Sequence, residues 1–269
     1  MTTQTREFEF TSAQFDKIRL LAKERAGIHL TEAKFDLVYS RLARRIRALR
    51  LRSFADYLGY LAKNDEDEAR EMINALTTNV TAFFRENHHF DFLADAASKR
   101  IQASPIKVWC CASSTGEEPY SIAMTLMEAR RPDFRILASD LDTVVLRTAA
   151  AGVYPEARVE GVPPEQLRRW FMTGCGDRDG TVRVRPELQT QIRFRQINLM
   201  NDWPIKGPLD AIFCRNVIIY FERSTQIALF HRFADLLRPG GFLFLGHSES
   251  VQDEPRLRSV GRTIYERVE

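Results

Sequence analysis

The stretch Lys107-Val-Trp-Cys-Cys-Ala-Ser-Ser-Thr-Gly-Glu-Glu-Pro-Tyr-Ser121 decides how most of this chain folds. A short apolar run ends in a loop of small residues, and the loop leads into a helical stretch near 118–130. The same pattern is repeated along the chain, with strands expected at 107–112, 135–139, 192–197, 209–214 and 241–246 and further helices near 142–151 and 222–237. Strands that alternate with helices predict a parallel sheet with right-handed crossovers.

Three segments add detail to this sheet domain. The sequence Arg238-Pro-Gly-Gly241 predicts the end of the last helix, and Thr263–Val268 predicts a final edge strand. Between the second and third strands, the turn-rich segment Gly174–Gly180 precedes the β-branched segment Thr181–Arg185. This arrangement predicts a small antiparallel hairpin inserted in the sheet domain.

The first 75 residues show apolar positions at helical spacing and no strand pattern, which predicts a small helical bundle. From Lys17 to Arg52 there are 11 basic and 3 acidic residues, a local charge of +8, although the whole chain carries only +3. This segment therefore predicts a positive face that meets an anionic partner, which could be nucleic acid, an anionic lipid surface or an acidic protein.

The overall composition is that of an ordinary globular protein, with 269 residues, 44% hydrophobic and 28% charged. No apolar run approaches the ~20 residues of a membrane span and no secretory signal is seen, so we expect a cytoplasmic protein with no direct membrane insertion. The four cysteines lack zinc or disulfide spacing, and His88-His89 lacks a third ligand, so no metal site is expected.

The loop after the first strand indicates what this domain binds. It contains neither a G-x-G-x-x-G nor a P-loop motif, and it offers Glu117 and Glu118 where a phosphate would need bare amides. Asp140 ends the second strand, 24 positions after Gly116, which is a placement that suits ribose hydroxyls. A carboxylate for an ammonium group and another for a ribose together indicate S-adenosylmethionine. The alternative is that Glu117 and Glu118 only favour the dipole of the helix that they begin.

Five motifs in a fixed order carry a resemblance to a known family. They are Thr78–Phe90, Ser114–Ser121, Ala138–Asp142, Phe213–Phe221 and Gly246–Glu249. Together they closely resemble the chemotaxis receptor glutamate methyltransferases, the CheR family. The resemblance implies an α/β protein with a small all-helical N-terminal domain (1–75), a linker that contributes to the cofactor site (76–90) and a Rossmann-like methyltransferase domain (91–269). The last would carry an antiparallel β-subdomain at about 162–190.

The resemblance also implies roles for individual residues. Arg85 and Tyr220 would flank the transferred methyl group and orient the acceptor carboxylate. S-adenosylmethionine, which leaves as S-adenosylhomocysteine, would be bound by Asn79, Thr81, Arg85, Glu117, Glu118, Asp140, Asn198, Leu199, Arg215 and Asn216. One of Glu117 and Glu118 would hold the methionine ammonium, and the sequence does not decide which. A glutamate acceptor is ionised at neutral pH, since its free pKa is near ~4.3, so no general base is needed.

The basic helix completes the prediction. Its arginines would face the acidic helical region of transmembrane chemotaxis receptors, and they are Arg41, Arg44, Arg47 and Arg50. A solvated helix face is the other interpretation. Some family members also dock a receptor tail on the β-subdomain, which the sequence leaves open here. The competing functions are methylation of RNA or of another acidic protein, and a non-catalytic S-adenosylmethionine-binding scaffold. We expect a monomer that binds no nucleic acid.

Overall fold

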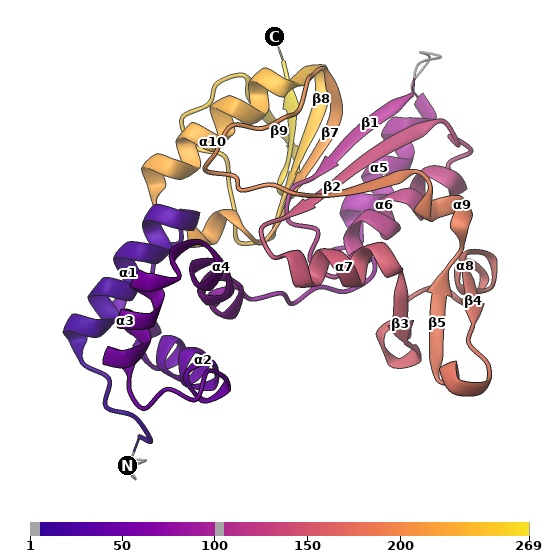
Figure 1. Ribbon diagram of the computed structural model, residues 1–269. Helices are drawn as coiled ribbons and strands as arrows, with labels where there is room; N and C mark the ends of the chain where they lie inside the picture. The colour runs from indigo at the N-terminus through magenta and orange to yellow at the C-terminus, as the bar shows by residue number, and fades with distance from the viewer. Residues whose placement is uncertain (1–5, 100–104, 269) are drawn as a thin grey trace. The chain divides into compact units, whose positions relative to one another are not determined.

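The structure is a computed structural model that describes residues 6–99 and 105–268 (Figure 1). The chain divides into two compact units. The helical unit comprises the residues up to Thr78 together with Tyr220–Glu222. The sheet unit comprises Asn79–Ile219 and the residues from Arg223 onward.

The helical unit contains the bundle that the sequence predicts. Its helices are α1 (Ser12–Ala26), α2 (Phe35–Ala48), α3 (Phe54–Lys63) and α4 (Asp65–Leu76), with a 3-10 turn at Glu32–Lys34. A capping box begins α1, because the Thr11 hydroxyl accepts the Gln14 amide and the Gln14 side chain accepts the Thr11 amide. Phe10 and Phe54 pack with ring centroids 4.2 Å apart in the core of this unit.

A partly buried cluster of Arg45, Glu68 and Tyr57 ties three of these helices together. Arg45 on α2 donates to both carboxylate oxygens of Glu68 on α4, at 2.8 and 2.6 Å. The Tyr57 hydroxyl on α3 donates to the same carboxylate at 2.9 Å. Burial raises the pKa of Tyr57, so its hydroxyl stays protonated. The bundle thus has a polar clamp beside its aromatic core.

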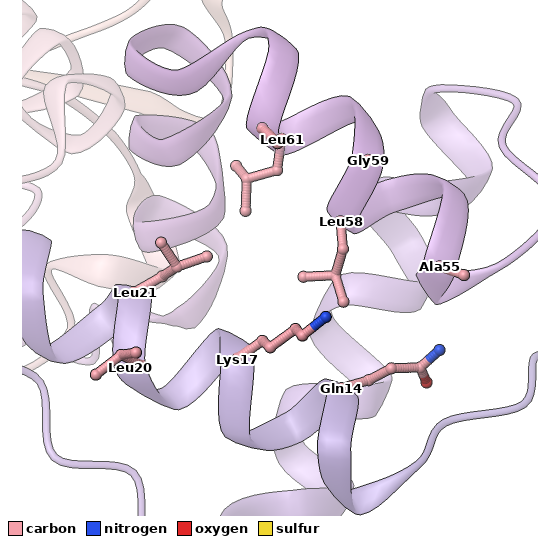
Figure 2. Close-up of a pocket in the computed structure, with 9 residues that line it drawn as sticks. Gln14, Lys17, Leu20, Leu21, Ala55, Leu58, Gly59 and Leu61 are labelled. Carbon is pink, nitrogen blue, oxygen red and sulfur yellow. The ribbon is translucent and has the colours of Figure 1, made fainter.

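An apolar groove of about 600 Å³ lies between α1 and α3 (Figure 2). Leu20 and Leu58 line it, and Leu20 is 57% exposed. Lys17 extends across the groove toward Leu58. Gly59 faces open space, since a Cβ built there meets nothing within 4 Å.

The helical unit also takes in a short segment from far along the chain. The His29 amide donates to the Tyr220 carbonyl at 2.7 Å, and Ile28 forms an antiparallel bridge with Phe221. Lys23 pairs with Glu222 at 2.9 Å. Residues 220–222 therefore complete a unit whose other residues all precede residue 79.

The sheet unit is built on seven strands in the order β6-β2-β1-β7-β8-β10-β9. They are β1 (Ile106–Cys110), β2 (Phe134–Asp140), β6 (Ile192–Gln196), β7 (Leu209–Cys214), β8 (Leu237–Leu245), β9 (Leu257–Gly261) and β10 (Ile264–Arg267). The first five strands in this order pair in parallel, and β10 runs antiparallel to both its neighbours. The chain moves outward from β1 to β6 and then returns to β7, so strand order reverses beside β1. In such a sheet ligands bind at the carboxyl ends of the strands at this reversal.

Helices cover both faces of the large sheet. Val108 and Cys110 of β1 belong to one apolar core with residues of α5 (His88–Lys99) and α6 (Glu117–Glu128). Trp109 points to the opposite face, where its ring packs 5.8 Å from that of Phe233 on α10 (Arg223–Leu236). Residues that alternate along β1 thus serve opposite faces, as a doubly covered sheet requires.

A small antiparallel sheet, in the order β3-β5-β4, projects from the sheet unit (Figure 1). The predicted hairpin is its β4 (Phe171–Thr173) and β5 (Thr181–Val184). A third strand, β3 (Val153–Pro155), pairs with β5 and directly follows α7 (Thr143–Ala151). Short helices surround these strands, namely α8 (Pro164–Trp170), α9 (Pro186–Gln189) and 3-10 turns at Glu156–Arg158 and Gly176–Arg178.

The predicted end of the last helix is confirmed, since α10 ends at Leu236, just before residues 238–241. Those residues lie inside β8, which starts at Leu237. One other prediction at the C-terminal end of the sheet was wrong. The segment 263–268 forms β10 between β8 and β9, so the edge strand is β9 instead. Within the part of the chain that is described, no helix has the length and apolar character needed to span a membrane.

Candidate functional site

The loop between β1 and α6 has a backbone shape that requires glycine. The φ angles of Ser114 and Gly116 are 47° and 99°. A Cβ on Gly116 would lie 2.8 Å from the Tyr154 hydroxyl and 2.9 Å from Cβ of Ala149. The same hydroxyl donates to the Thr115 carbonyl at 2.7 Å. The small sheet therefore holds the loop that leads to the N-terminus of α6.

The two adjacent glutamates of this loop have different partners. Glu118 accepts a hydrogen bond from Arg215 at 2.6 Å and one from the Cys110 thiol at 3.2 Å. Burial, followed by the charge of Glu118, raises the pKa of Cys110, so this thiol stays protonated and is no nucleophile. Glu118 is thus tied to the neighbouring strands β1 and β7.

Glu117 points toward the small sheet. Its carboxylate accepts from the Thr115 hydroxyl at 2.6 Å and pairs with Arg158 at 2.9 Å. The side chain of Glu117 is fully buried, whereas that of Arg158 is 45% exposed. An exposed guanidinium can leave more readily than the buried Arg215, so Glu117 is the better placed of the two glutamates to receive an ammonium group.

Asp140 lies at the end of β2, beside the β1 loop. One of its oxygens accepts the Ser114 amide at 2.8 Å, and the other accepts the Asp142 amide at 3.0 Å. Burial raises the pKa of Asp140, and the backbone amides act in the opposite direction. Each oxygen takes one of these bonds, which leaves acceptor capacity for further donors such as ribose hydroxyls.

The segment after Thr78 runs along this edge of the sheet unit. The Asn79 amide donates to Asp142 at 3.0 Å, and the Ser114 hydroxyl donates to the Asn79 carbonyl at 3.1 Å. Thr81, two residues after Asn79, is partly exposed. Further along, Arg85 is half-buried and donates to the Val80 carbonyl at 2.8 Å. The structure thus brings Asn79 together with the β1 and β2 exit loops.

Arg215 and Asn216 follow β7. The Arg215 side chain is almost fully buried, at 1% exposed, and it bridges Glu118 and Glu86. It also donates to the Arg85 carbonyl. Asn216 has a positive φ of 56°. The guanidinium of Arg215 is therefore held by groups of the protein itself.

Asn198 and Leu199 follow β6, the neighbour of β2. The Ile197 amide donates to the Asp140 carbonyl at 3.1 Å, so this turn begins next to Asp140. The Asn198 side chain accepts the Met200 amide at 3.0 Å. Arg232 donates to the Leu199 carbonyl at 2.9 Å. The predicted adenine contacts are thus in a fixed turn at the same edge as the carboxylates.

The donor set of this edge suits a cationic nucleoside better than a phosphate. Carboxylates dominate it, and the Ser113 hydroxyl is buried with no hydrogen-bond partner among the described residues. Over 6–99 and 105–268, no group of histidine, cysteine, aspartate and glutamate side chains could hold a metal ion. His88 and His89 instead both lie within 3.2 Å of the Arg262 carbonyl through Nε2.

The four predicted substrate arginines are not equivalent. Arg41, Arg44 and Arg47 lie on α2, whereas Arg50 lies in the turn that follows it. Arg41 donates to the Leu76 and Thr77 carbonyls, each at 2.6 Å, and so closes the C-terminal end of α4. Burial lowers the pKa of Arg41. Arg47 pairs with Glu7 at 3.1 Å, at the surface. Arg44 and Arg50 are exposed and have no ion-pair partner among the described residues.

Tyr220 belongs to the helical unit, whereas Arg85 belongs to the sheet unit. The Tyr220 carbonyl is taken by the His29 amide. The joint role of Tyr220 and Arg85 at the transferred methyl group therefore stays a prediction.

Comparison with known proteins identifies the family. Residues 79–265 match the family model described as "CheR methyltransferase, SAM binding domain", and residues 13–77 match "CheR methyltransferase, all-alpha domain". The chain belongs to the CheR methyltransferase family. It is therefore an S-adenosylmethionine-dependent methyltransferase, and the predicted fold class, enzyme class and cofactor are confirmed.

Individual relatives match over nearly the whole chain. Chemotaxis protein methyltransferase 2 of Pseudomonas aeruginosa is 51% identical over 96% of this chain and 94% of its own length. The chemotaxis protein methyltransferase of Escherichia coli is 46% identical over 97% of this chain and 93% of its own length. Both units of this CheR-family chain therefore have counterparts in these relatives.

Sequence reasoning missed several charged residues that hold the site. Glu86 pairs with Arg215 at 3.2 Å and with His247 at 3.1 Å. Arg158 reaches Glu117 from the small sheet, and Arg232 fixes the turn after β6. Glu86 stands in the Thr78–Phe90 motif next to Arg85, which was a usable signal. Nothing in the sequence near Arg158 or Arg232 marks them.

Proposed function

We propose that this CheR-family enzyme transfers the methyl group of S-adenosylmethionine to glutamate side chains in the cytoplasmic helical region of transmembrane chemotaxis receptors. The products are glutamate methyl esters and S-adenosylhomocysteine. The full-length similarity to relatives named chemotaxis protein methyltransferase, up to 51% identical, is the observation that carries this proposal. The reaction then occurs in the cytoplasm, and the enzyme acts as a monomer without binding nucleic acid.

For the cofactor we propose a site at the carboxyl edge of the large sheet. Asp140 would bind the ribose and Glu117 the methionine ammonium, with Asn198 and Leu199 around the adenine. Asn79, Thr81 and Arg85 would contact the cofactor from the segment that enters the sheet unit. Glu118, Arg215 and Asn216 would form its floor. The carboxylates at the ends of β1 and β2 support this assignment, since they suit an ammonium group and ribose hydroxyls.

The chemistry places modest demands on this chain. The cofactor supplies a methyl group activated by a sulfonium, and an ionised glutamate can attack it in line without a general base. The protein must hold the acceptor carboxylate and exclude water, and alignment of this kind contributes about 7–11 kcal/mol in well-ordered systems. A guanidinium fork such as Arg85 clamps two carboxylate oxygens, and the Tyr220 phenol would add one weaker bond.

For receptor binding we propose the exposed arginines of α2 and of the turn that follows it. Arg44 and Arg50 have free guanidinium groups among the described residues, and Arg47 shares its charge with Glu7. Arg41 would contribute by closing the end of α4. Long-range attraction to an acidic helical bundle requires only that such charges face solvent.

The small sheet supports a second contact. In the order β3-β5-β4, both β3 and β4 pair on one side only, with β5. An edge strand can accept an extended peptide as an additional strand, and we propose this as the docking mode of a receptor tail.

We propose a functional division of the chain into a helical domain, a linker and a methyltransferase domain. Their bounds are 1–75, 76–90 and 91–269, with the β-subdomain inserted at about 162–190.

A labelled-methyl assay tests the function. Purified enzyme and S-adenosylmethionine with a labelled methyl group are incubated with receptor-containing membranes, with the same membranes lacking receptor, and with RNA. We expect base-labile label on the receptor alone, since a carboxyl ester hydrolyses in mild base. Base-stable label on RNA would instead support the nucleic-acid alternative. Cofactor binding without transfer to any acceptor would support a scaffold.

A further inference from the structure

Glu249 is a buried carboxylate for which neither the proposed chemistry nor the cofactor assignment has a use. It lies after β8, in the Gly246-His-Ser-Glu249 motif, and it is 5% exposed. Its oxygens accept three backbone amides, from Gly246 at 2.6 Å, from Asn216 at 2.9 Å and from Ile219 at 3.2 Å. Two of these amides belong to the loop that follows β7.

The loop that Glu249 holds contains a left-handed residue. Asn216 has a φ of 56°, a conformation that asparagine adopts more readily than other residues with a Cβ. The neighbouring Ile219 amide points into the same carboxylate. Converging backbone amides form a small anion site, which the Glu249 carboxylate fills.

The exit of β8 is shaped to fit against the same loop. A Cβ on Gly246 would overlap the side-chain nitrogen of Asn216 and lie 2.8 Å from its backbone nitrogen. A turn closes this exit, since the Glu249 amide donates to the Gly246 carbonyl at 2.9 Å. Gly246 and Glu249 therefore both fix this loop. Gly246 leaves room for Asn216 because it has no side chain, and Glu249 accepts the Asn216 and Ile219 amides.

We infer that Glu249 is a positioning residue for cofactor binding, which acts by fixing the loop that carries Arg215 and Asn216. The inference rests on the proposed function in one respect, that these two residues form the floor of the cofactor site. If the loop relaxes, the Arg215 guanidinium loses its alignment with Glu118 at the start of α6. The disturbance would then reach the β1 loop, where the cofactor carboxylates lie.

This role requires acceptor oxygens on both sides of the Glu249 side chain. Burial raises the pKa of Glu249, and the backbone amides that it accepts act in the opposite direction. One oxygen accepts two amides and the other accepts one, so the group must offer acceptors on both sides. A glutamine has the same shape but presents an NH₂ donor on one side, where it would face a backbone donor. Glu249→Gln therefore removes at least one bond and leaves an amide without its acceptor.

The experiment measures binding of S-adenosylhomocysteine by calorimetry, with thermal unfolding followed in parallel, for the full chain and its variants. We expect Glu249→Gln to weaken binding at least about tenfold, or about 1.4 kcal/mol. The KM for S-adenosylmethionine should rise while the KM for the receptor is unchanged. The matched control is Glu254→Gln, because Glu254 is equally buried and also accepts a backbone amide, that of Arg256, away from the β7 loop.

The outcomes separate this inference from the proposed function. A wild-type chain that binds no S-adenosylhomocysteine would overturn the cofactor assignment itself. Wild-type binding with Glu249→Gln within about twofold of it, or equal weakening by Glu254→Gln, would overturn the role of Glu249.

A glycine substitution gives an independent test if Glu249→Gln fails to fold. Gly246→Ala keeps the carboxylate but pushes against Asn216, and we expect it to weaken S-adenosylhomocysteine binding as well. Its control is Gly161→Ala in the same unit, since a Cβ on Gly161 meets nothing within 4 Å. Equal binding by both alanine variants would contradict the inference.

Discussion

The edge of the large sheet and the outer face of α2 are both rich in charge, yet they use it differently. At the sheet edge, Arg215 is buried and bridges two carboxylates. On α2, Arg44 is exposed and has no ion-pair partner among the described residues. Removing one partner of a buried pair leaves an uncompensated charge, whereas an exposed charge is screened by water and salt. The first arrangement holds a fixed site, and the second suits long-range attraction of a partner.

Removing the buried cation Arg215 gives the strongest test of this difference between the two regions. We expect Arg215→Met to lower the free energy of unfolding by about 3–5 kcal/mol, because Glu118 and Glu86 would be left buried without their cation. Urea titration measures the change. The control Arg44→Met should stay within about 0.5 kcal/mol of the wild type. Equal effects of the two variants would show that burial does not distinguish the two regions.

Between the two extremes lies Arg85, which is half-buried and donates to the Val80 carbonyl. We expect Arg85→Ala to reduce kcat for receptor methylation about 100-fold, because the acceptor carboxylate loses its clamp. The loss in S-adenosylhomocysteine affinity should be smaller. Arg195→Ala, at an exposed position on β6, is the control. An unchanged rate of methyl transfer would refute the role of Arg85.

The pH dependence of stability extends the comparison to His89, a buried side chain that carries no charge at neutral pH. Burial, together with the positive charge of Arg215 and the neighbouring His88, lowers the pKa of His89 to about 4, although the Arg262 carbonyl and Glu86 act in the opposite direction. Between its ordinary value of 6.5 and about 4, the unfolded chain binds a proton that the folded chain does not. Stability therefore falls as the pH drops through this range.

From about pH 7.5 to pH 5 we expect His89 to cost about 2 kcal/mol of unfolding free energy. The measurement is urea unfolding of the wild type and of His89→Phe at both pH values. The phenylalanine variant should lose this part of the pH dependence. Identical pH slopes for the two proteins would mean that His89 titrates normally in the folded state.

The smallest expected effect concerns the exposed face. Arg44→Glu should slow receptor methylation about two- to fivefold at about 50 mM salt, and the difference should disappear near 500 mM because salt screens exposed charges. Arg47→Glu should act more weakly, since Glu7 already offsets part of that charge. Lys63→Glu on α3 is the control, and cofactor affinity should be constant throughout. A salt-independent loss would argue against electrostatic attraction.

The sequence predicted the alternation of strands and helices because β1, β2 and β7 are short apolar runs bounded by turns. It missed β9 and therefore took β10 for the edge strand, because β9 (Leu257–Gly261) is exposed at four of its five positions and has no continuous apolar run. The start of β8 was hidden by Pro239 and Gly240, residues that end helices more often than they occupy strands. These strands are defined by pairing across the sheet, which local patterns do not record.

Some features of the candidate site could likewise be predicted from the sequence, and others could not. Gly116 and Asp140 could be predicted, since a loop after one strand and an acid after the next are local features. The sequence could not show that Arg41 is bound within the protein, because the two carbonyls that accept its hydrogen bonds lie 35 and 36 residues away in the chain. The different partners of Glu117 and Glu118 also come from distant segments, at Arg158 and Arg215.

The three residues Tyr220–Glu222 have a consequence for how this protein can be divided. A fragment that stops at residue 78 would lack the carbonyl that accepts the His29 amide and the carboxylate that pairs with Lys23. The helical unit is therefore one compact folded unit, but the first 78 residues alone do not contain all of it, because it includes Tyr220–Glu222. Transplanting it between relatives means carrying the short piece between β7 and β8 along with the first 78 residues.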